Sequence, residues 1–149
     1  MRKVQRSALV CHSADAMYSL VDDIESYSEF LPWCRHTEVH FRQGSIAEAT
    51  LELHRGELSR QFRTRNTATA KSAIDMQLVD GPFRHLVGRW TFTQLGESGS
   101  KVALDLEFEF SNRAADLLFG AFFEDTCNSL VDAFTRRADT VFAASTGES

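Results

Sequence analysis

The segment from Val102 to Phe110 places an apolar residue at every second position, in the sequence VALDLEFEF. Its apolar series is Val102, Leu104, Leu106, Phe108 and Phe110, and the positions between them include Asp105, Glu107 and Glu109. This alternation is typical of a β-strand with one face in a hydrophobic core and the other in water. A sheet built around such a strand must bury its apolar face against another layer of the protein.

Shorter alternations of the same kind precede this strand. They predict strands at Lys3–His12, 35–43, 47–54, 58–66, 74–78 and around Trp90 and Phe92. Turns containing glycine separate several of them, at Gly44, Arg55–Glu57 and Gly96–Ser100. We therefore expect about six to seven strands that pair antiparallel in the order of the chain.

Two short helical segments follow the first strand. Ser13 is a suitable N-cap for the first of them. Its apolar residues recur at helical spacing: Met17, Leu20, Val21 and Ile24. The second segment begins at Ser26 and is expected to stop at Pro32, because the residue before a proline avoids the helical conformation.

The chain closes with one long amphipathic helix, which Ser111 or Asn112 can cap. Its apolar residues recur at steps of three or four: Phe123, Cys127, Leu130, Phe134, Ala138 and Val141. No other segment has an apolar stripe long enough to cover the sheet. The predicted fold class is α+β, with a curved antiparallel sheet of about six to seven strands gripping a long C-terminal helix.

An internal apolar cavity follows from this arrangement, because two short helices and one long helix do not close both ends of so large a sheet. A single domain is expected over residues 1–144, with residues 145–149 as a disordered tail. Twelve Phe against two Tyr favour an aromatic core or an aromatic-lined cavity, since Phe brings bulk without a polar group.

Charge and cysteine content restrict the function classes. The formal net charge of −5 argues against general coating of nucleic acid. Cys11, Cys34 and Cys127 are an odd number without CxxC spacing, which indicates reduced thiols and a cytosolic location. No stretch resembles a signal peptide or a membrane span, so we expect any membrane contact to be peripheral.

One turn combines apolar and basic residues where a polar tip is usual. The sequence LVDGPFRHLVGRWTF (78–92) has a Gly81-Pro82 turn followed by Phe83, and Arg84 and Arg89 lie nearby. We expect Phe83 and Leu86 to be exposed at the mouth of the cavity. The arginines beside them suit an anionic surface, either lipid headgroups or RNA.

Three stretches carry a family resemblance: YSEFLPWC (27–34), the 78–92 turn and LDLEFEFSNRAADLLFG (104–120). Together they resemble the START-like coenzyme-Q-binding and polyketide-cyclase-like family, and most of all its branch of bacterial ribosome-association toxins. The resemblance extends from Lys3 to Ala144. One departure is Ser28, because the family commonly has proline after the tyrosine of the first motif.

This resemblance implies the helix-grip fold and two competing functions. One is binding of ubiquinone or another polyprenyl lipid in support of respiration, with no cofactor required. The other is a toxin that binds the large ribosomal subunit and blocks subunit association, with an antitoxin as a further implied partner. A polyketide-cyclase-like enzyme is a third alternative, although fold analogy is weak evidence for chemistry. The expected protein is not an enzyme and lies in the cytoplasm or at the periphery of the inner membrane.

The candidate site residues form two sets. The cavity and its mouth are expected to comprise Phe30, Leu31, Pro32, Trp33, Leu51, Met76, Phe83, Leu86, Trp90, Leu106, Phe108, Phe119, Phe122 and Phe123. Contact with RNA, the ribosome or another anionic surface is assigned to Arg60, Arg63, Arg65, Arg84 and Arg89. A solvated strand face, balanced by neighbouring glutamates and aspartates, is the alternative interpretation of these arginines.

Metal binding and catalysis find less support. Cys34, His36, Glu38 and His40 share one parity, but alternate strand residues lie roughly 7 Å apart, too far to converge on one ion without a bend. We therefore expect no metal site. Asp80 is a candidate general base for a cyclase, but an aspartate before Gly-Pro more often shapes the turn.

Overall fold

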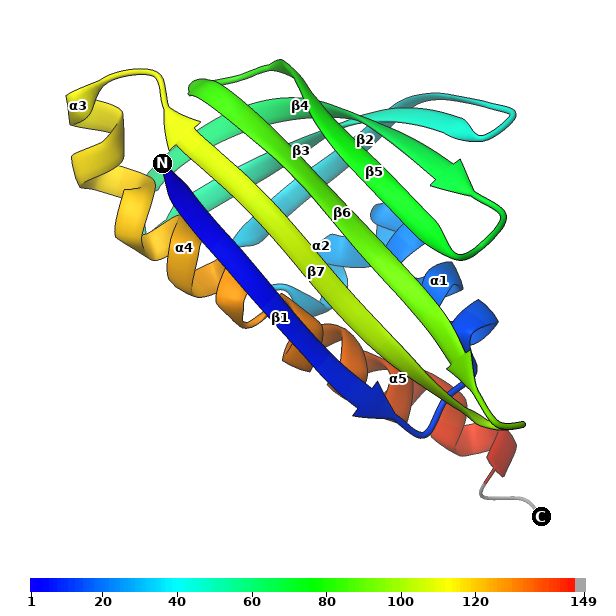
Figure 1. Ribbon diagram of the computed structural model, residues 1–149. Helices are drawn as coiled ribbons and strands as arrows, with labels where there is room; N and C mark the ends of the chain where they lie inside the picture. Colours follow the sequence, from blue (N-terminus) through cyan, green and yellow to red (C-terminus); the bar gives the residue numbers. More distant parts are fainter. Residues whose placement is uncertain (147–149) are drawn as a thin grey trace.

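The computed structural model describes the backbone of residues 1–146 and the side chains as far as Phe142. Seven strands of this part form one antiparallel sheet in the order β1-β7-β6-β5-β4-β3-β2 (Figure 1). The strands are β1 (Arg2–Val10), β2 (Cys34–Gln43), β3 (Ile46–Arg55), β4 (Leu58–Thr69), β5 (Ala73–Asp80), β6 (Phe83–Leu95) and β7 (Gly99–Phe110). The N-terminal strand therefore pairs with the last one, while the other strands form a meander.

Short helices connect β1 to β2, as the sequence predicts. They are α1 (Ala14–Asp22), the 3-10 turn η1 (Ile24–Ser26) and α2 (Tyr27–Phe30). Ser13 is the N-cap of α1, because its side chain accepts a hydrogen bond from the Ala16 backbone N at 3.1 Å. The chain leaves the helical conformation at Leu31, immediately before Pro32.

The C-terminal helix crosses the concave face of the curved sheet (Figure 1). It consists of α3 (Arg113–Ala115), a π-helical segment η2 (Asp116–Gly120), α4 (Ala121–Asn128) and α5 (Leu130–Thr146). Asn112 caps its start by accepting a hydrogen bond from the Ala115 backbone N at 2.8 Å. The expected uninterrupted helix is thus divided at η2 and at Ser129, and the expectation that Val141 belongs to its apolar face is wrong, since Val141 is 42% exposed.

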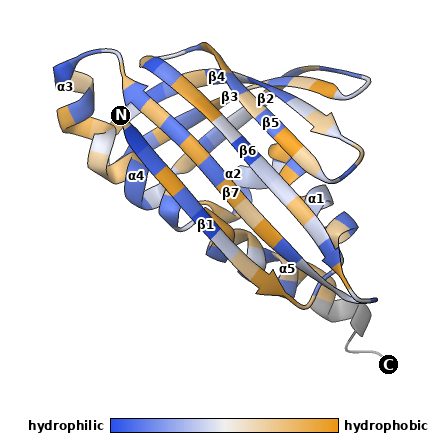
Figure 2. Cartoon of the chain, viewed as in Figure 1, coloured by the Kyte–Doolittle hydropathy of each residue, from blue (hydrophilic) through white to orange (hydrophobic). Residues whose placement is uncertain are grey.

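The main hydrophobic core lies between the sheet and this helix. All five apolar residues that alternate along β7 are buried, which confirms the strand and its orientation. Bands of hydrophobic and hydrophilic residues alternate along β6 and β7 in Figure 2, as expected for strands with one buried face. The predicted α+β fold, a curved sheet gripping a C-terminal helix, is confirmed.

The end of helix α5 overlaps the segment that we expected to be a disordered tail. Helix α5 continues to Thr146, two positions into the segment 145–149 that we expected to be disordered. Residues 147–149 lie outside the described part of the chain. Within the described part, no helix is both long enough and apolar enough to cross a bilayer.

Candidate ligand cavity

An apolar cavity of about 80 Å³ lies between the concave face of the sheet and the C-terminal helix. Strands β3 to β7 supply one wall, and the segment 24–33 together with α4 and α5 supplies the other. Its lining residues are Ile24, Tyr27, Leu31, Trp33, Leu51, Phe62, Thr64, Asn66, Met76, Leu86, Trp90, Leu104, Leu106, Phe123, Cys127, Leu130 and Phe134. None of these residues carries a charge at neutral pH.

Few polar groups face this cavity, and most of them are satisfied within the protein. Thr64 Oγ1 donates to Asn66 Oδ1 at 3.1 Å, and the Tyr27 hydroxyl donates to the backbone oxygen of Val21. Trp33 is 9% exposed, and its indole Nε1 is buried without a hydrogen-bond partner among the described residues. Buried indole N–H groups usually have a partner, so this unpaired donor is unusual.

The titratable groups in the wall are held in their neutral forms. Burial raises the pKa of the Tyr27 hydroxyl, and burial also raises the pKa of the Cys127 thiol. A thiol reacts as a nucleophile only when it is deprotonated, so Cys127 is chemically quiet at neutral pH. The cavity wall is therefore apolar and uncharged, and its titratable groups stay neutral at pH 7.

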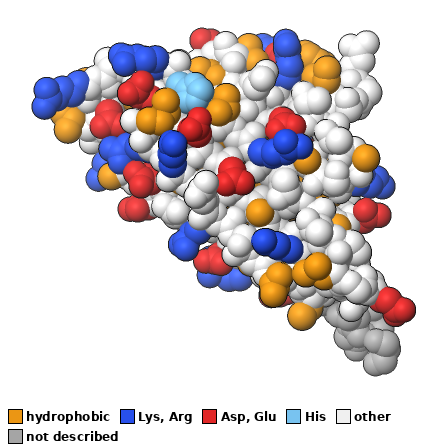
Figure 3. All heavy atoms as spheres, viewed as in Figure 1, with side chains coloured by type: hydrophobic (Ala, Val, Ile, Leu, Met, Phe, Trp, Pro, Cys, Tyr) orange, Lys and Arg blue, Asp and Glu red, His pale blue; other side chains and the backbone are white. Residues whose placement is uncertain are grey.

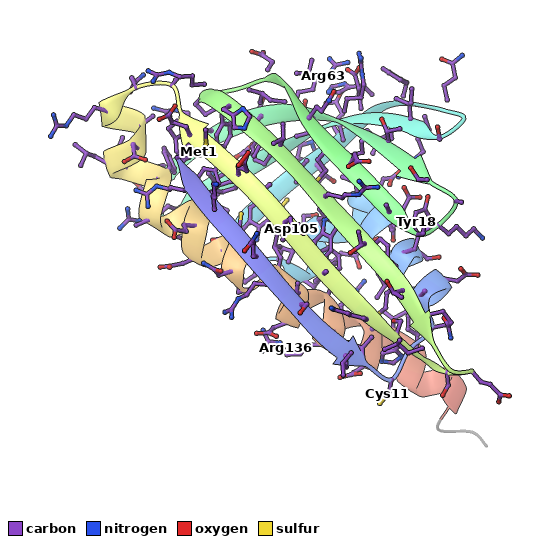
Figure 4. All side chains as sticks on the ribbon, in the orientation of Figure 1. Met1, Cys11, Tyr18, Arg63, Asp105 and Arg136 are labelled. Carbon is purple, nitrogen blue, oxygen red and sulfur yellow. The ribbon has the colours of Figure 1, made fainter. Side chains whose placement is uncertain are left out.

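A second hollow lies directly outside the cavity, between α2 and α5. This outer groove has a volume of about 350 Å³ and is lined by Phe30, Leu31, Pro32, Trp33, Ser129, Ala133, Arg136, Arg137 and Thr140. Leu31 and Trp33 belong to both linings, so these two side chains form the partition between the cavity and the groove. Arg136 marks the α5 side of the groove in Figure 4.

The structure sorts the predicted cavity residues into distinct places. Those on the cavity wall are Leu31, Trp33, Leu51, Met76, Leu86, Trp90, Leu106 and Phe123. Phe30 and Pro32 line only the outer groove. Phe122 is half-buried on the outer side of the helix, where the guanidinium of Arg55 lies 5.8 Å from its ring centre.

The prediction that Phe83 is exposed at the cavity mouth is wrong. Phe83 is 5% exposed, and its ring stacks on that of Phe110 with 4.5 Å between centres. Its neighbours Phe62, Phe108 and Phe123 complete an aromatic cluster that closes this end of the sheet. Leu86 is buried as well, at 5% exposure, and faces the cavity from inside.

Phe108 and Phe119 are also core residues that do not line the cavity. Both are fully buried, at 0% exposure. Phe108 lies 4.9 Å from Phe123 between ring centres, and Phe119 stacks near Phe110 at 6.4 Å. They extend the aromatic cluster under the start of the C-terminal helix, which explains much of the phenylalanine excess.

Four of the five predicted surface arginines are ion-paired. Arg63 and Arg65 both bind Glu48, whose carboxylate is buried between them, with Nε–O distances of 2.9 and 2.8 Å. Arg84 and Arg89 lie 3.5 Å from Glu109 and 3.6 Å from Asp75. Arg60 differs, because its guanidinium lies 5.6 Å from the Phe119 ring centre. A solvated strand face with balanced charges therefore describes this surface better than one continuous basic patch. Arg63, on β4, is labelled in Figure 4.

The row Cys34, His36, Glu38 and His40 does not converge. A β-bulge between Cys34 and His36 breaks their shared parity, and Cys34 turns into the core. Burial raises the pKa of Cys34 to about 11. The described residues contain no group of three or more His, Cys, Asp or Glu side chains that could hold a metal ion. Asp80 accepts a hydrogen bond from the Gly81 backbone N at 3.0 Å, so it shapes the turn.

Several cavity residues were missed from the sequence. Phe62, Thr64 and Asn66 alternate along β4 on its inner face, but two of the three are polar. Cys127, Leu130 and Phe134 belong to the predicted apolar face of the helix. The sequence did not show which residues of that face lie opposite the cavity. The polar inner residues of β4 carried no signal that hydropathy alternation could detect.

Residues 10–135 match the family described as polyketide cyclase / dehydrase and lipid transport. The chain belongs to this family. Ribosome association toxin RatA of Vibrio cholerae is 44% identical over 142 residues, covering 95% of this chain and 99% of that protein. The Escherichia coli RatA is 39% identical over 144 residues, covering 97% of this chain and 91% of that protein.

This chain also resembles two proteins that are not named RatA. The mitochondrial coenzyme Q-binding protein COQ10 of Drosophila melanogaster is 27% identical, covering 87% of this chain and 55% of that protein. A START superfamily protein from Mycobacterium smegmatis has a TM-score of 0.79 at 22% identity, covering 93% of this chain and 98% of that one. The latter likeness shows the helix-grip fold of this chain.

Proposed function

We propose that this protein binds a hydrophobic small molecule, a quinone or another polyprenyl-type lipid, in the cavity between the sheet and the C-terminal helix. The observation that carries the proposal is the apolar wall with the free Trp33 Nε1 donor. A carbonyl oxygen on an otherwise apolar ring would satisfy this N–H group. The family description, which includes lipid transport, and the name of the COQ10 relative support the same ligand class.

The size of the cavity sets a condition on this function. Its 80 Å³ is less than the roughly 150 Å³ that accommodates benzene in an engineered protein core. A quinone ring therefore enters only if the wall moves. Leu31 and Trp33 separate the cavity from the outer groove of about 350 Å³, so displacement of this partition would join the two spaces. We propose that the ring occupies the cavity and that the polyprenyl chain lies in the groove.

Titration with a short-chain quinone tests this proposal, because both tryptophans of the chain, Trp33 and Trp90, line the cavity. Saturable quenching of their fluorescence at micromolar quinone is expected, together with a bound lipid in native mass spectra of protein purified from its host. Absence of both would overturn the proposal.

A Trp33→Phe variant probes the hydrogen bond itself. It should weaken quinone binding by about threefold to tenfold, as expected for one hydrogen bond, while Trp90 still reports binding. An isoprenoid hydrocarbon without oxygen atoms is the matched ligand, and its affinity should stay unchanged. Equal loss for both ligands would show that Trp33 acts only through packing.

Ribosome association is the second candidate, and the names and coverage of the RatA relatives favour it. We propose as the alternative that the protein binds the large ribosomal subunit and blocks subunit association, which would place it in the cytoplasm; an antitoxin partner stays a prediction. Ribosome profiles with added protein test it. Unchanged subunit joining at stoichiometric excess would remove it, whereas a salt-sensitive loss of joined ribosomes would support it.

A binding role without catalysis is proposed over a cyclase activity. The cavity wall lacks charged side chains, and the pKa values of Tyr27 and Cys127 are raised by burial, so proton transfer at neutral pH has no suitable group there. A cyclase substrate that this protein converts, with loss of conversion in an Asp80→Asn variant, would contradict the proposal.

A further inference from the structure

One end of the molecule exposes leucines beside arginines. Leu117 is 75% exposed and Leu118 is 39% exposed, both within η2, and Leu58 at the start of β4 is 43% exposed. Arg55, Arg60 and Arg113 belong to the same end of the fold. We call these six residues the tip surface: Leu58, Leu117, Leu118, Arg55, Arg60 and Arg113.

Contacts between the turn and the helix make the tip surface continuous. Arg55 Nη1 donates to the backbone oxygen of Leu118 at 2.8 Å, and Arg60 lies over the ring of Phe119. The helix at α3 extends beyond the edge of the sheet in Figure 1. Blue and orange side chains lie next to one another at this end in Figure 3. Leu117 and Leu118 thus lie in a helical segment that is hydrogen-bonded to Arg55 of β3, and not in a loop.

The charge of the tip surface is positive. Among the described side chains, no carboxylate lies within salt-bridge distance of Arg55, Arg60 or Arg113. The nearby Asp116 and Glu109 line a hollow with Arg113, but they form ion pairs with Arg2 and Arg84 instead. Exposed leucine next to unpaired arginine is the composition of a surface that lies at the boundary of an anionic bilayer.

We propose that the tip surface docks the protein onto an anionic lipid surface. Leu117 and Leu118 would enter the boundary between headgroups and acyl chains, and the arginines would reach the phosphates with their aliphatic stems packed on the lipid. RNA fits less well, because leucine side chains do not stack on bases and Phe83, the aromatic residue next to Arg84, is buried.

Docking at this end would act on the helix that forms the cavity wall. The tip leucines belong to the same helical run as Phe123 and Cys127, which line the cavity. The lipid contact does not depend on the identity of the cavity ligand, nor on whether the cavity binds one. The two proposals can therefore fail separately.

Flotation with vesicles tests the docking proposal. Wild-type protein should float with vesicles of phosphatidylcholine containing about a third phosphatidylglycerol, and less with phosphatidylcholine alone. The double variant Leu117→Glu/Leu118→Glu should bind at least about tenfold more weakly. Leu9→Glu is the matched control, since Leu9 is also 75% exposed but lies near the opposite end of β1, two residues before the labelled Cys11 (Figure 4).

The charge contribution has its own pair of variants. Arg113→Gln should reduce binding by roughly fivefold, and Lys101→Gln on the sheet should leave binding unchanged. Circular dichroism and melting curves would verify that all variants fold, which is expected because each replaced side chain is exposed.

Three results would overturn the proposal. The first is wild-type protein that fails to float with anionic vesicles, and the second is a double variant that floats as well as the Leu9→Glu control. The third is a double variant that keeps vesicle binding but loses ribosome binding or self-association, which would assign the tip surface to a ribosome or to a second copy of this chain.

Discussion

Phe83 illustrates how one side chain closes an end of the fold. Gly81 precedes it with φ of +147°, and a Cβ atom there would lie 2.7 Å from Cβ of Phe62. The turn can therefore approach β4 closely only with glycine at this position. This approach places the Phe83 ring edge-on to Phe62 and stacked on Phe110. The apolar residue after the turn serves the core and not the surface.

Truncation of Phe83 should accordingly weaken the whole domain. Phe83→Ala is expected to lower the free energy of unfolding by about 3–5 kcal/mol, because it removes a fully enclosed ring and leaves a cavity. Urea denaturation measures this change. Phe41→Ala is the control, because Phe41 is 39% exposed, and it should change stability by less than about 1 kcal/mol. Similar values for the two variants would contradict the packing described for Phe83.

Glu48 is the second residue whose surroundings decide its role. Hydrogen bonds from Arg65 and then Arg63 lower the pKa of its carboxyl below the ordinary 4.5. Because the pKa of Glu48 is lower in the folded state than in the unfolded chain, its carboxylate stabilises the fold at any pH above the unfolded-state pKa. That contribution disappears as the pH falls through the folded-state pKa.

A Glu48→Gln variant should show this dependence. At pH 7 its melting temperature is expected to lie a few degrees below that of the wild type, because Arg63 and Arg65 lose their shared carboxylate. The difference should begin to shrink as the pH falls below 4.5, where the unfolded chain takes up the proton first, and should vanish below the lowered folded-state pKa, where the native carboxyl is neutral as well. Melting curves from pH 3 to 7 measure it, with exposed Glu57→Gln as control. A difference that is constant over this range would contradict the ion-pair explanation.

At the level of elements, β6 makes room for the cavity with a glycine. Gly88 faces the interior, and a Cβ atom there would lie 2.6 Å from Leu106 Cδ1 and 2.8 Å from Met76 Cε. Both neighbours line the cavity and end in flexible side-chain tips. A methyl group at this position would therefore push two side chains into the space proposed for the ligand.

Gly88→Ala should reduce quinone affinity by about tenfold or more while the protein still folds, since displacing two side-chain tips is a modest overpacking. Val87→Ala, which changes the neighbouring position on the opposite face of β6, should leave affinity unchanged. Quenching titrations of both variants measure the effect. Unaltered affinity in Gly88→Ala would exclude this part of the cavity as the binding place.

The sequence predicted a helix or strand correctly wherever one local feature, such as hydropathy alternation, a capping side chain or a proline, decided it. Alternation located β7, the side-chain caps Ser13 and Asn112 located helix starts, and Pro32 marked the end of α2. The site was only partly readable, because contacts across the sheet decide it. The Arg63–Glu48–Arg65 group joins β4 to β3, and the burial of Phe83 depends on strand β4 and helix α4. Local pattern carries no information about such partners.

At the scale of the whole molecule, the three cysteines report on opening of the fold. Cys11 is exposed, whereas Cys34 and Cys127 are buried. Burial raises the pKa of Cys34 to about 11 and also raises that of Cys127, so neither thiol is ionised at pH 8. Since Cys127 also lines the cavity, its reaction requires the wall between sheet and helix to open.

Alkylation at pH 8 followed by peptide mapping should label Cys11 rapidly and the other two far more slowly. A bound quinone is expected to slow the labelling of Cys127 further, because the ligand fills the space beside the thiol. The rate at Cys11 serves as the internal control and should not change. Rapid native labelling of Cys127 would contradict a closed cavity.

The pairing of β1 with β7 has a consequence for synthesis of the chain. Arg2 lies opposite Phe108 and Val10 opposite Ser100, so among the described strands β1 pairs only with β7, which is synthesised much later. Strand β1 must stay unpaired through most of translation, and the concave apolar face stays open until the C-terminal helix emerges. A nascent chain arrested before residue 110 would expose both an unpaired strand and that face, which makes it a natural client for chaperones.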